Sequence, residues 1–223
     1  MYILNEELVF PHPDFANDYG VLAIGGDLSA NRLILAYNNG IFPWFENGDE
    51  ILWWSPPERM VLYPEKVKVS KSMRKFIRDN KYKITVNKDF RSVIENCSSI
   101  KREGQNSTWI VDSMVEAYIN LHKLGYAHSV EVWENDELVG GLYGVNVGKV
   151  FCGESMFSKK NNTSKLAFIF LARELEKQNY KLIDCQMYTD HLASLGAEEI
   201  PRDVFLKELY ESRELEAWDF KNA

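Results

Sequence analysis

The stretch that decides the fold is residues 128–155, HSVEVWENDELVGGLYGVNVGKVFCGES. Three runs rich in β-branched and aromatic residues follow one another in it, over residues 128–133, 138–146 and 149–155. The breaks between the runs contain Asn135-Asp136 and Gly148, which are residue types that form tight turns. The pattern predicts an antiparallel meander of three strands.

Helices and further strands are expected on both sides of this meander. Before it, Ser70 caps one predicted helix, and Asp112 opens an amphipathic helix that Gly125 ends. After it, we expect a helix over 164–178, a buried strand over 182–187 and helices over 191–195 and 203–211. The order of helix, antiparallel meander, helix, strand and helix matches the N-acyltransferase fold of acetyl-CoA-dependent enzymes (GNAT).

The first 60 residues differ from the rest because they are rich in proline, glycine and aromatic residues. One helix is expected there, with Asp27 or Ser29 as its cap and Gly40 as its stop. We therefore predict an α/β (α+β) protein of two parts. Residues 1–60 form a small N-terminal α+β domain, and residues 61–223 form a GNAT-like domain.

Composition limits the class of protein. The 223 residues carry a net charge of −7, with 45% hydrophobic and 26% charged residues, which is ordinary for a globular protein and unlike one that coats nucleic acid. The three cysteines, Cys97, Cys152 and Cys185, lack metal-ligand spacing, so we expect no metal site, no disulfide framework and a reducing, cytoplasmic compartment. The acidic start and the lack of long apolar runs predict neither a signal peptide nor a membrane span.

Basic residues gather on the helix expected after Ser70. Four of them lie on its polar side: Lys71, Arg74, Lys75 and Arg78. A basic stripe of this kind attracts phosphates and makes binding depend on salt. The alternative interpretation is a solvated helix face.

Aromatic residues gather in the predicted loops. The tryptophans Trp44, Trp53, Trp54 and Trp109 lie beside proline, glycine, serine or threonine. Such residues line pockets for apolar ligands. They also pack interfaces between parts of a chain, and the two interpretations are compatible.

Three polar residues occupy positions that we expect to be buried. Glu154 ends a predicted strand and needs a partner, which is either a cation of the protein or a cation of a ligand. Asp184 and Gln186 lie two apart in an apolar strand, so strict alternation would place them on one face, with Ile183 and Cys185 on the other. They form either a functional pair or a satisfied hydrogen-bond network within the core.

Nine short strings, in this order, resemble the leucyl/phenylalanyl-tRNA–protein transferase family of bacteria. The resemblance runs from about Phe10 to about Leu209. Each string is weak alone, but their combined order is highly specific. They are LAIGGDLS (22–29), GIFPWF (40–45), WWSP (53–56), TWI (108–110), HSVEVW (128–133), LVGGLYG (138–144), FCGESMFS (151–158), LIDCQ (182–186) and SLGA (194–197).

The resemblance implies an aminoacyltransferase with a small N-terminal domain and a GNAT-like C-terminal domain. Members transfer Leu or Phe, and Met less well, from aminoacyl-tRNA to proteins that begin with Arg or Lys, which marks these proteins for degradation by the N-end rule pathway. The enzyme binds the aminoacylated 3′ end of the tRNA and needs no cofactor and no acetyl-CoA. This agrees with the lack of a glycine-rich pyrophosphate loop in the sequence.

The same resemblance assigns roles to the candidate residues. Glu154 would receive the acceptor's N-terminal Arg or Lys side chain, and Asp184 and Gln186 would form the catalytic pair at the α-amine. The basic stripe would bind tRNA. The residues implied to line the pocket for the Leu or Phe side chain are Trp44, Trp109, Met156 and Leu142, the last at a position where some members have Met.

Two other classes of protein are compatible with parts of the pattern. A conventional acetyl-CoA N-acetyltransferase would need a phosphate-binding glycine loop, which we do not find. A non-catalytic RNA-binding module would need neither Glu154 nor the pair Asp184 and Gln186.

Overall fold

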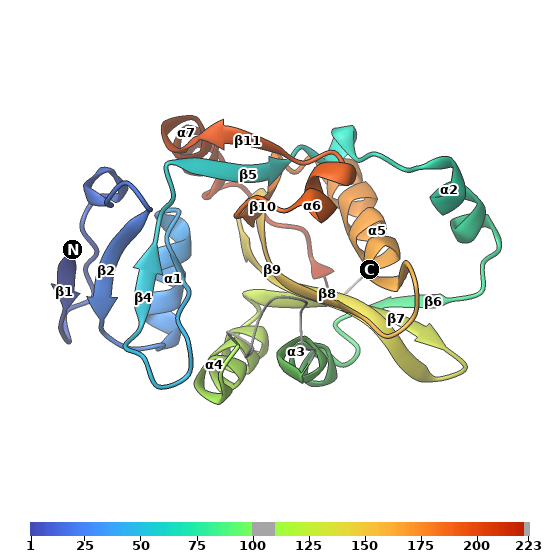
Figure 1. Cartoon of the computed structure of the whole chain (residues 1–223), viewed down its shortest axis with the longest axis horizontal. Coiled ribbons are helices and arrows are strands. Elements are labelled where there is room, and N and C mark those ends of the chain that lie inside the picture. The colour runs from blue at the N-terminus through green and yellow to red at the C-terminus, as the bar shows by residue number, and fades with distance from the viewer. Residues whose placement is uncertain (100–109, 221–223) are drawn as a thin grey trace.

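The computed structural model describes residues 1–99 and 110–220 of the chain (Figure 1). Two sheets, one of four strands and one of seven, are surrounded by helices. The predicted mixed α/β class is therefore confirmed. Residue 60, the expected domain boundary, falls inside β5 (Glu58–Leu62), which is the first strand of the larger sheet along the chain. The division at that residue therefore stays a prediction.

The smaller sheet is built from the first 54 residues and has the strand order β1-β2-β4-β3. Strand β1 is parallel to β2, and the other pairs are antiparallel. Helix α1 begins after Ser29, whose hydroxyl accepts the Arg32 N–H as predicted for a cap. The bounds are β1 (Tyr2–Leu4), β2 (Val21–Gly25), α1 (Ala30–Asn38), β3 (Phe42–Pro43) and β4 (Leu52–Trp54), with a short 3-10 turn over Pro13–Phe15.

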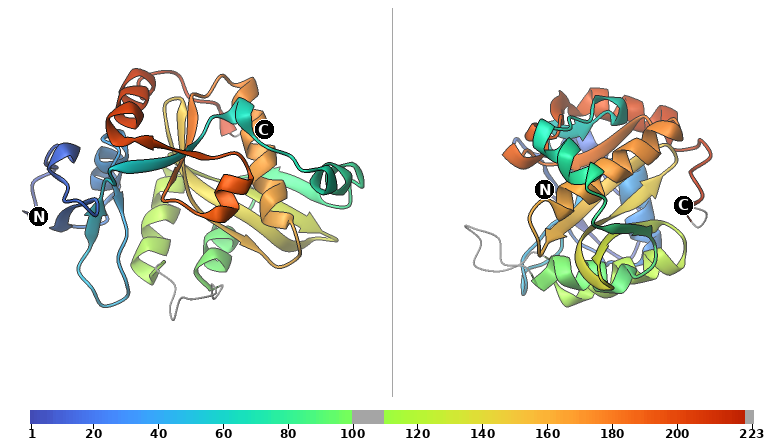
Figure 2. Two further views of the ribbon diagram at one scale, coloured as in Figure 1. Left: turned by 45° about the horizontal axis from the view of Figure 1, so that its top comes forward. Right: turned by 90° about the vertical axis from the view of Figure 1, so that its right-hand side faces the viewer.

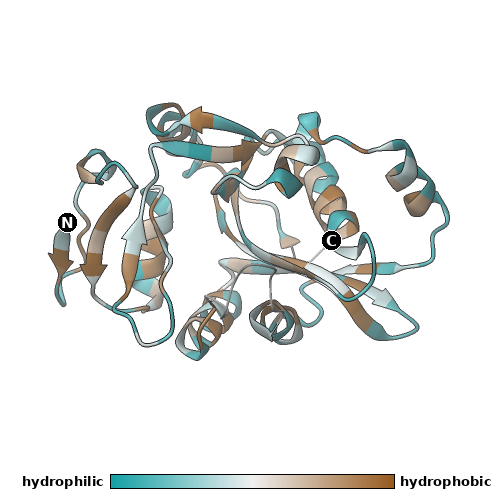
Figure 3. Cartoon of the chain, in the orientation of Figure 1, coloured by the Kyte–Doolittle hydropathy of each residue, from teal (hydrophilic) through white to brown (hydrophobic). Residues whose placement is uncertain are grey.

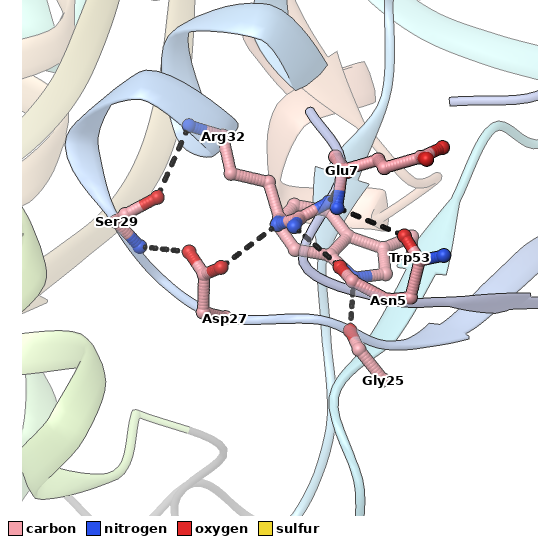
Figure 4. A network of polar contacts seen from close by, with 7 residues as sticks. All are labelled: Asn5, Glu7, Gly25, Asp27, Ser29, Arg32 and Trp53. Atoms are coloured by element: carbon pink, nitrogen blue, oxygen red, sulfur yellow. Dashed lines mark hydrogen bonds and ion pairs between the residues drawn. The ribbon is translucent and has the colours of Figure 1, made fainter. Parts of the chain in front are cut away.

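A buried arginine explains the glycine-rich turn before α1 (Figure 4). Arg32 is fully buried, and its guanidinium donates to Asp27 and to the backbone oxygens of Asn5 and Glu7. Gly26 has φ +74°, and a Cβ there would lie 3.1 Å from the Arg32 Nε. Gly26 leaves room for the Arg32 side chain, and the hydrogen bonds of Arg32 hold the N-terminal segment against α1. The role of this turn is therefore structural.

The larger sheet has the strand order β11-β5-β10-β9-β8-β7-β6. The predicted meander forms its centre, and β10 joins β9 in parallel. The sequence patterns did not identify β5 or β11, which pair with each other beside β10. The bounds are β6 (Lys83–Val86), β7 (Ala127–Glu134), β8 (Glu137–Val147), β9 (Val150–Ser158), β10 (Leu182–Gln186) and β11 (Glu198–Pro201).

Helices cover both faces of this sheet. Figures 1 and 2 show α3 and α4 on one face and α5 on the other. Figure 3 shows α5 banded brown and teal, as expected for a helix with one apolar face. The bounds are α2 (Lys71–Arg78), α3 (Phe90–Ser99), α4 (Asp112–Lys123), α5 (Thr163–Lys177), α6 (Asp190–Ser194) and α7 (Arg202–Ser212), with a 3-10 turn over Pro64–Lys66.

The cysteines are buried and free of disulfides, and residues 1–99 and 110–220 contain no cluster of His, Cys, Asp or Glu that could hold a metal ion. Within these same ranges, no helix combines the length and the apolar character needed to cross a membrane.

Candidate active site

A cavity of about 550 Å³ lies where the two parts of the chain meet. The segment around β3 contributes one wall, and strands β8, β9 and β10 with helices α5 and α6 contribute the rest. Most lining side chains are apolar, and a carboxylate and an amide lie among them. The residues that matter below are Phe42, Trp44, Leu142, Glu154, Met156 and Gln186.

The apolar wall combines residues from distant parts of the sequence. Leu142 on β8 and Met156 on β9 are paired across the two strands, and Trp44 faces the same cavity from the segment directly after β3. Trp54 fixes Trp44, because its indole N–H donates to the Trp44 backbone oxygen over 2.7 Å and the two rings lie 5.3 Å apart. Trp53 is fully buried in the N-terminal core, so for this residue the packing interpretation holds.

Glu154 is the only acidic side chain on the cavity wall within the described residues, and it is only 8% exposed. Its carboxylate accepts a hydrogen bond from the Tyr118 hydroxyl over 3.1 Å and one from the Gln186 amide over 2.8 Å. The Tyr37 hydroxyl in turn contacts that of Tyr118. No Lys, Arg or His of residues 1–99 and 110–220 forms an ion pair with this carboxylate.

Burial dominates the electrostatics of Glu154. Loss of water raises its pKa to about 7, and the negative charge of Asp184 acts in the same direction. Hydrogen bonds from Tyr37, Tyr118 and Gln186 favour the carboxylate and oppose this rise. The internal salt bridge considered for this residue is not present in the described part of the chain, where the partners of the carboxylate are the Tyr118 hydroxyl and the Gln186 amide.

Asp184 has a different environment from the one expected. Its two carboxylate oxygens accept from the Arg59 Nε and Nη2, each over 2.7 Å, and both side chains are almost fully buried. Asp184 does not line the cavity, whereas Ile183, Cys185 and Gln186 do. The two-residue alternation ends here because a β-bulge separates Asp184 from Gln186.

Gln186 occupies an unusual backbone position at this bulge. Its φ is +60°, which is uncommon for a residue other than glycine. Its backbone N–H donates to the Asp184 Oδ1 over 2.9 Å, and its side-chain amide reaches Glu154 on the neighbouring strand. Asp184 and Gln186 are thus in contact as a hydrogen-bonded unit, but only Gln186 is accessible from the cavity.

The basic stripe lies away from the cavity, on α2. Ser70 caps this helix as predicted, and Met73 anchors it in the core. The four cations are exposed, none lines the cavity, and none has an ion pair with a described residue. We call Lys71, Arg74, Lys75 and Arg78 the α2 basic stripe.

Comparison with known proteins places this geometry in a family. The profile described as leucyl/phenylalanyl-tRNA protein transferase matches residues 61–210, and the profile for the N-terminal domain of the same proteins matches residues 26–57. The chain belongs to the leucyl/phenylalanyl-tRNA protein transferase family. The resemblance inferred from the sequence strings, and with it the expected class of enzyme, is confirmed.

Individual relatives are similar in sequence to this chain along almost its whole length. The leucyl/phenylalanyl-tRNA–protein transferase of Flavobacterium psychrophilum is 60% identical over 93% of this chain and 98% of its own length. That of Thermodesulfovibrio yellowstonii is 50% identical over 98% of this chain and 91% of its own. Among solved structures, a GCN5-related N-acetyltransferase from Kribbella flavida is 10% identical, with a TM-score of 0.41 over 75% of this chain and 59% of its own.

For this family member, the structure brings together most of the predicted site residues. Trp44, Leu142, Glu154, Met156 and Gln186 share the cavity, Asp184 lies behind it, and the α2 basic stripe is separate. Trp109 lies outside the described residues, so its predicted place in the pocket stays a prediction.

Sequence reasoning missed three residues that support the site. Tyr37 and Tyr118 lie on the apolar faces of α1 and α4, a pattern that predicts core positions, although their hydroxyls lead to Glu154. Arg59 had no predicted role. One signal could have identified Arg59: it is a charged residue at the start of a buried strand, directly after the string WWSPPE (53–58).

Proposed function

We propose that this protein transfers Leu or Phe, and Met less efficiently, from aminoacyl-tRNA to the N-terminal Arg or Lys of acceptor proteins. The reaction would take place in the cytoplasm and mark those proteins for degradation by the N-end rule pathway. Family membership supports the class of reaction. The observation that carries the choice of acceptor is Glu154, a nearly buried carboxylate on the cavity wall without a cation of its own among the described residues.

The donor's side chain would occupy the apolar wall. Trp44, Leu142 and Met156 offer an aromatic ring, a branched side chain and a flexible thioether, which suit the long apolar side chains of Leu, Phe and Met. A smaller side chain such as that of Val would leave part of the wall uncovered. Loss of a methylene group in such a pocket costs roughly 1–3 kcal/mol, so rejection of Val should be modest.

The acceptor's N-terminal side chain would bind Glu154. Pairing with a guanidinium or ammonium would compensate the desolvation that raises the carboxyl pKa. A neutral side chain at the same place would leave this requirement unmet. The carboxylate therefore favours Arg and Lys over neutral N-terminal residues.

The chemistry needs no covalent enzyme intermediate, because the aminoacyl ester is already activated. The neutral α-amine of the acceptor attacks the ester carbonyl carbon, the C–N bond forms and the bond to the ribose oxygen breaks. The proton lost by the amine ends on the released ribose hydroxyl. Neither acetyl-CoA nor another cofactor takes part in this balance.

The enzyme's main contribution would be position. Gln186 reaches the cavity, and its side-chain oxygen is free to accept from the amine while its NH₂ group donates to Glu154. A glutamine amide is a very weak base, so we assign it the orientation of the amine. Asp184 contacts the backbone of Gln186 and would contribute through it.

The α2 basic stripe would bind the tRNA backbone. Its four exposed cations lie at helical spacings of three and four residues, which align them on one face. Phosphates are attracted to such a face even when the net charge of the protein is negative.

One assay tests this proposal. The protein is incubated with charged Phe-tRNA and a peptide that begins with Arg, and the product is read by mass spectrometry as a peptide extended by Phe at its N-terminus. An N-acetylated Arg peptide is the matched control, because it keeps the guanidinium but lacks a nucleophilic amine. Acetyl-CoA in place of Phe-tRNA tests the alternative acetyltransferase. No Phe-Arg product, or acetylation instead, would refute the proposal.

A further inference from the structure

The ion pair between Arg59 and Asp184 lies directly behind the proposed site. Arg59 is on β5 and Asp184 on β10, and the fork of two hydrogen bonds of 2.7 Å joins the two strands beside the bulge. The guanidinium carbon also lies 4.7 Å from the ring centre of Phe42 and 4.4 Å from that of Phe205. Phe42 lines the cavity, and Phe205 belongs to α7.

Arg59 therefore contacts three elements at once. It fixes the carboxylate of Asp184 in a single orientation, since a bidentate pair specifies geometry as well as charge. Its flat faces pack against the ring of Phe42 on β3 of the smaller sheet and the ring of Phe205 on α7. A lysine would keep the charge but could not reproduce this fork.

The orientation of Asp184 matters because one of its oxygens has a second task. Oδ1 accepts the Gln186 N–H as well as the Arg59 Nε–H. Gln186 has a positive φ, which is disfavoured for a residue with a side chain and persists only where its surroundings hold it. This conformation directs the Gln186 amide across to Glu154.

We propose that Arg59 is a positioning residue for aminoacyl transfer, because by fixing Asp184 it holds the Gln186 bulge in the conformation that aligns the Gln186 amide beside Glu154. Neither Arg59 nor Asp184 lines the cavity, so both act through Gln186. This inference rests on the proposed function for its kinetic consequences. Its structural part is independent of that function.

The kinetic test compares Arg59→Met, Arg59→Lys and the double variant Arg59→Met/Asp184→Asn with the unchanged protein. Misplacing a reacting group by about 1 Å costs about 100-fold in rate, so Arg59→Met should lower kcat by about that factor with little change in the KM for Phe-tRNA. Arg59→Lys should lose less, about tenfold. The double variant leaves no unpaired buried charge, so it should fold, but it lacks the fork and should keep most of the loss in kcat.

A measurement without substrate separates this proposal from the proposed function. Cys185-Gln186 is the only Cys-Gln peptide in the chain, so labelling with ¹³C-carbonyl Cys and ¹⁵N-Gln isolates the Gln186 amide in an NMR spectrum. Hydrogen exchange of this amide should accelerate at least tenfold in Arg59→Met. The Cys97-Ser98 amide on α3, the only Cys-Ser peptide in the chain and labelled by the same scheme, is the matched control and should keep its rate.

The possible outcomes are distinct. If the unchanged protein transfers no Phe, the proposed function fails, and the exchange rate of the Gln186 amide alone decides the role of Arg59. Unchanged exchange at that amide, or kcat within about threefold of the unchanged protein in folded Arg59→Met, overturns the positioning role. If Arg59→Met does not fold, Arg59→Lys and the double variant test the positioning role instead. A wild-type kcat together with a wild-type exchange rate of the Gln186 amide in both variants would overturn that role.

Discussion

Acidification should abolish most of the enzyme's preference for a cationic acceptor. Pairing with Arg requires the Glu154 carboxylate, whose pKa burial raises to about 7. About one pH unit below that value, about a tenth of the Glu154 carboxyl groups are ionised, and about one unit above it about nine tenths are. The ratio of kcat/KM for an Arg-initiated peptide to that for a citrulline-initiated peptide should therefore fall about tenfold between about pH 8 and about pH 6.

Citrulline is the appropriate comparison because it has nearly the shape of Arg without the charge. Both peptides also lose the same α-amine proton, so the titration of the amine cancels in the ratio. Glu154→Gln is the matched variant, since it keeps the hydrogen-bonding shape and cannot ionise. Its ratio should be low and constant with pH. A ratio that stays high down to pH 6 in the unchanged protein would refute the pairing of Glu154 with the acceptor side chain.

The same titration has a consequence for stability. The pKa of Glu154 is higher in the folded chain than its ordinary value of 4.5, so the folded state binds the proton more tightly than the unfolded state. The free energy of unfolding therefore falls as the pH rises from about 4.5 to about 7, by up to about 3 kcal/mol for this group. Glu154→Gln should raise the melting temperature at pH 8 and leave it nearly unchanged at pH 4.5, which calorimetry measures directly. An equal shift at both pH values would contradict this assignment.

Three further predictions concern other parts of the molecule. Replacing the four cations of the α2 basic stripe by Gln should raise the KM for Phe-tRNA and reduce the slope of log KM against log[salt] by about 2 to 4. As a control, replacing three exposed lysines elsewhere by Gln should change neither KM nor the slope appreciably: Lys123, Lys181 and Lys207. Met156→Ala should lower kcat/KM for Phe-tRNA by about tenfold or more without changing the KM for the Arg peptide, because it shortens only the apolar wall. Gly144→Ala should destabilise the protein by about 1–3 kcal/mol in urea unfolding, because the new Cβ would lie 2.3 Å from the Cys152 carbonyl oxygen, whereas Gly153→Ala has no contact closer than 3.7 Å and should cost less.

Local pattern was sufficient for much of the larger sheet. The meander follows from alternating β-branched residues and from turns at Asn135-Asp136 and Gly148, all of which are short-range features. Caps at Ser29 and Ser70 were readable for the same reason. Strands β5 and β11 were missed, because a short strand gains its stability from partners that are distant in the sequence.

The candidate site shows the same division. The sequence by itself identified Glu154 as a carboxylate in need of a partner, and the ordered strings identified the family. It could not show that Asp184 is neutralised by Arg59, which is 125 positions away, or that the strand alternation breaks before Gln186. Those facts depend on which side chains meet after the strands pair. Only the tertiary structure therefore decided that Gln186 and Glu154 are accessible from the cavity while Asp184 supports them from behind.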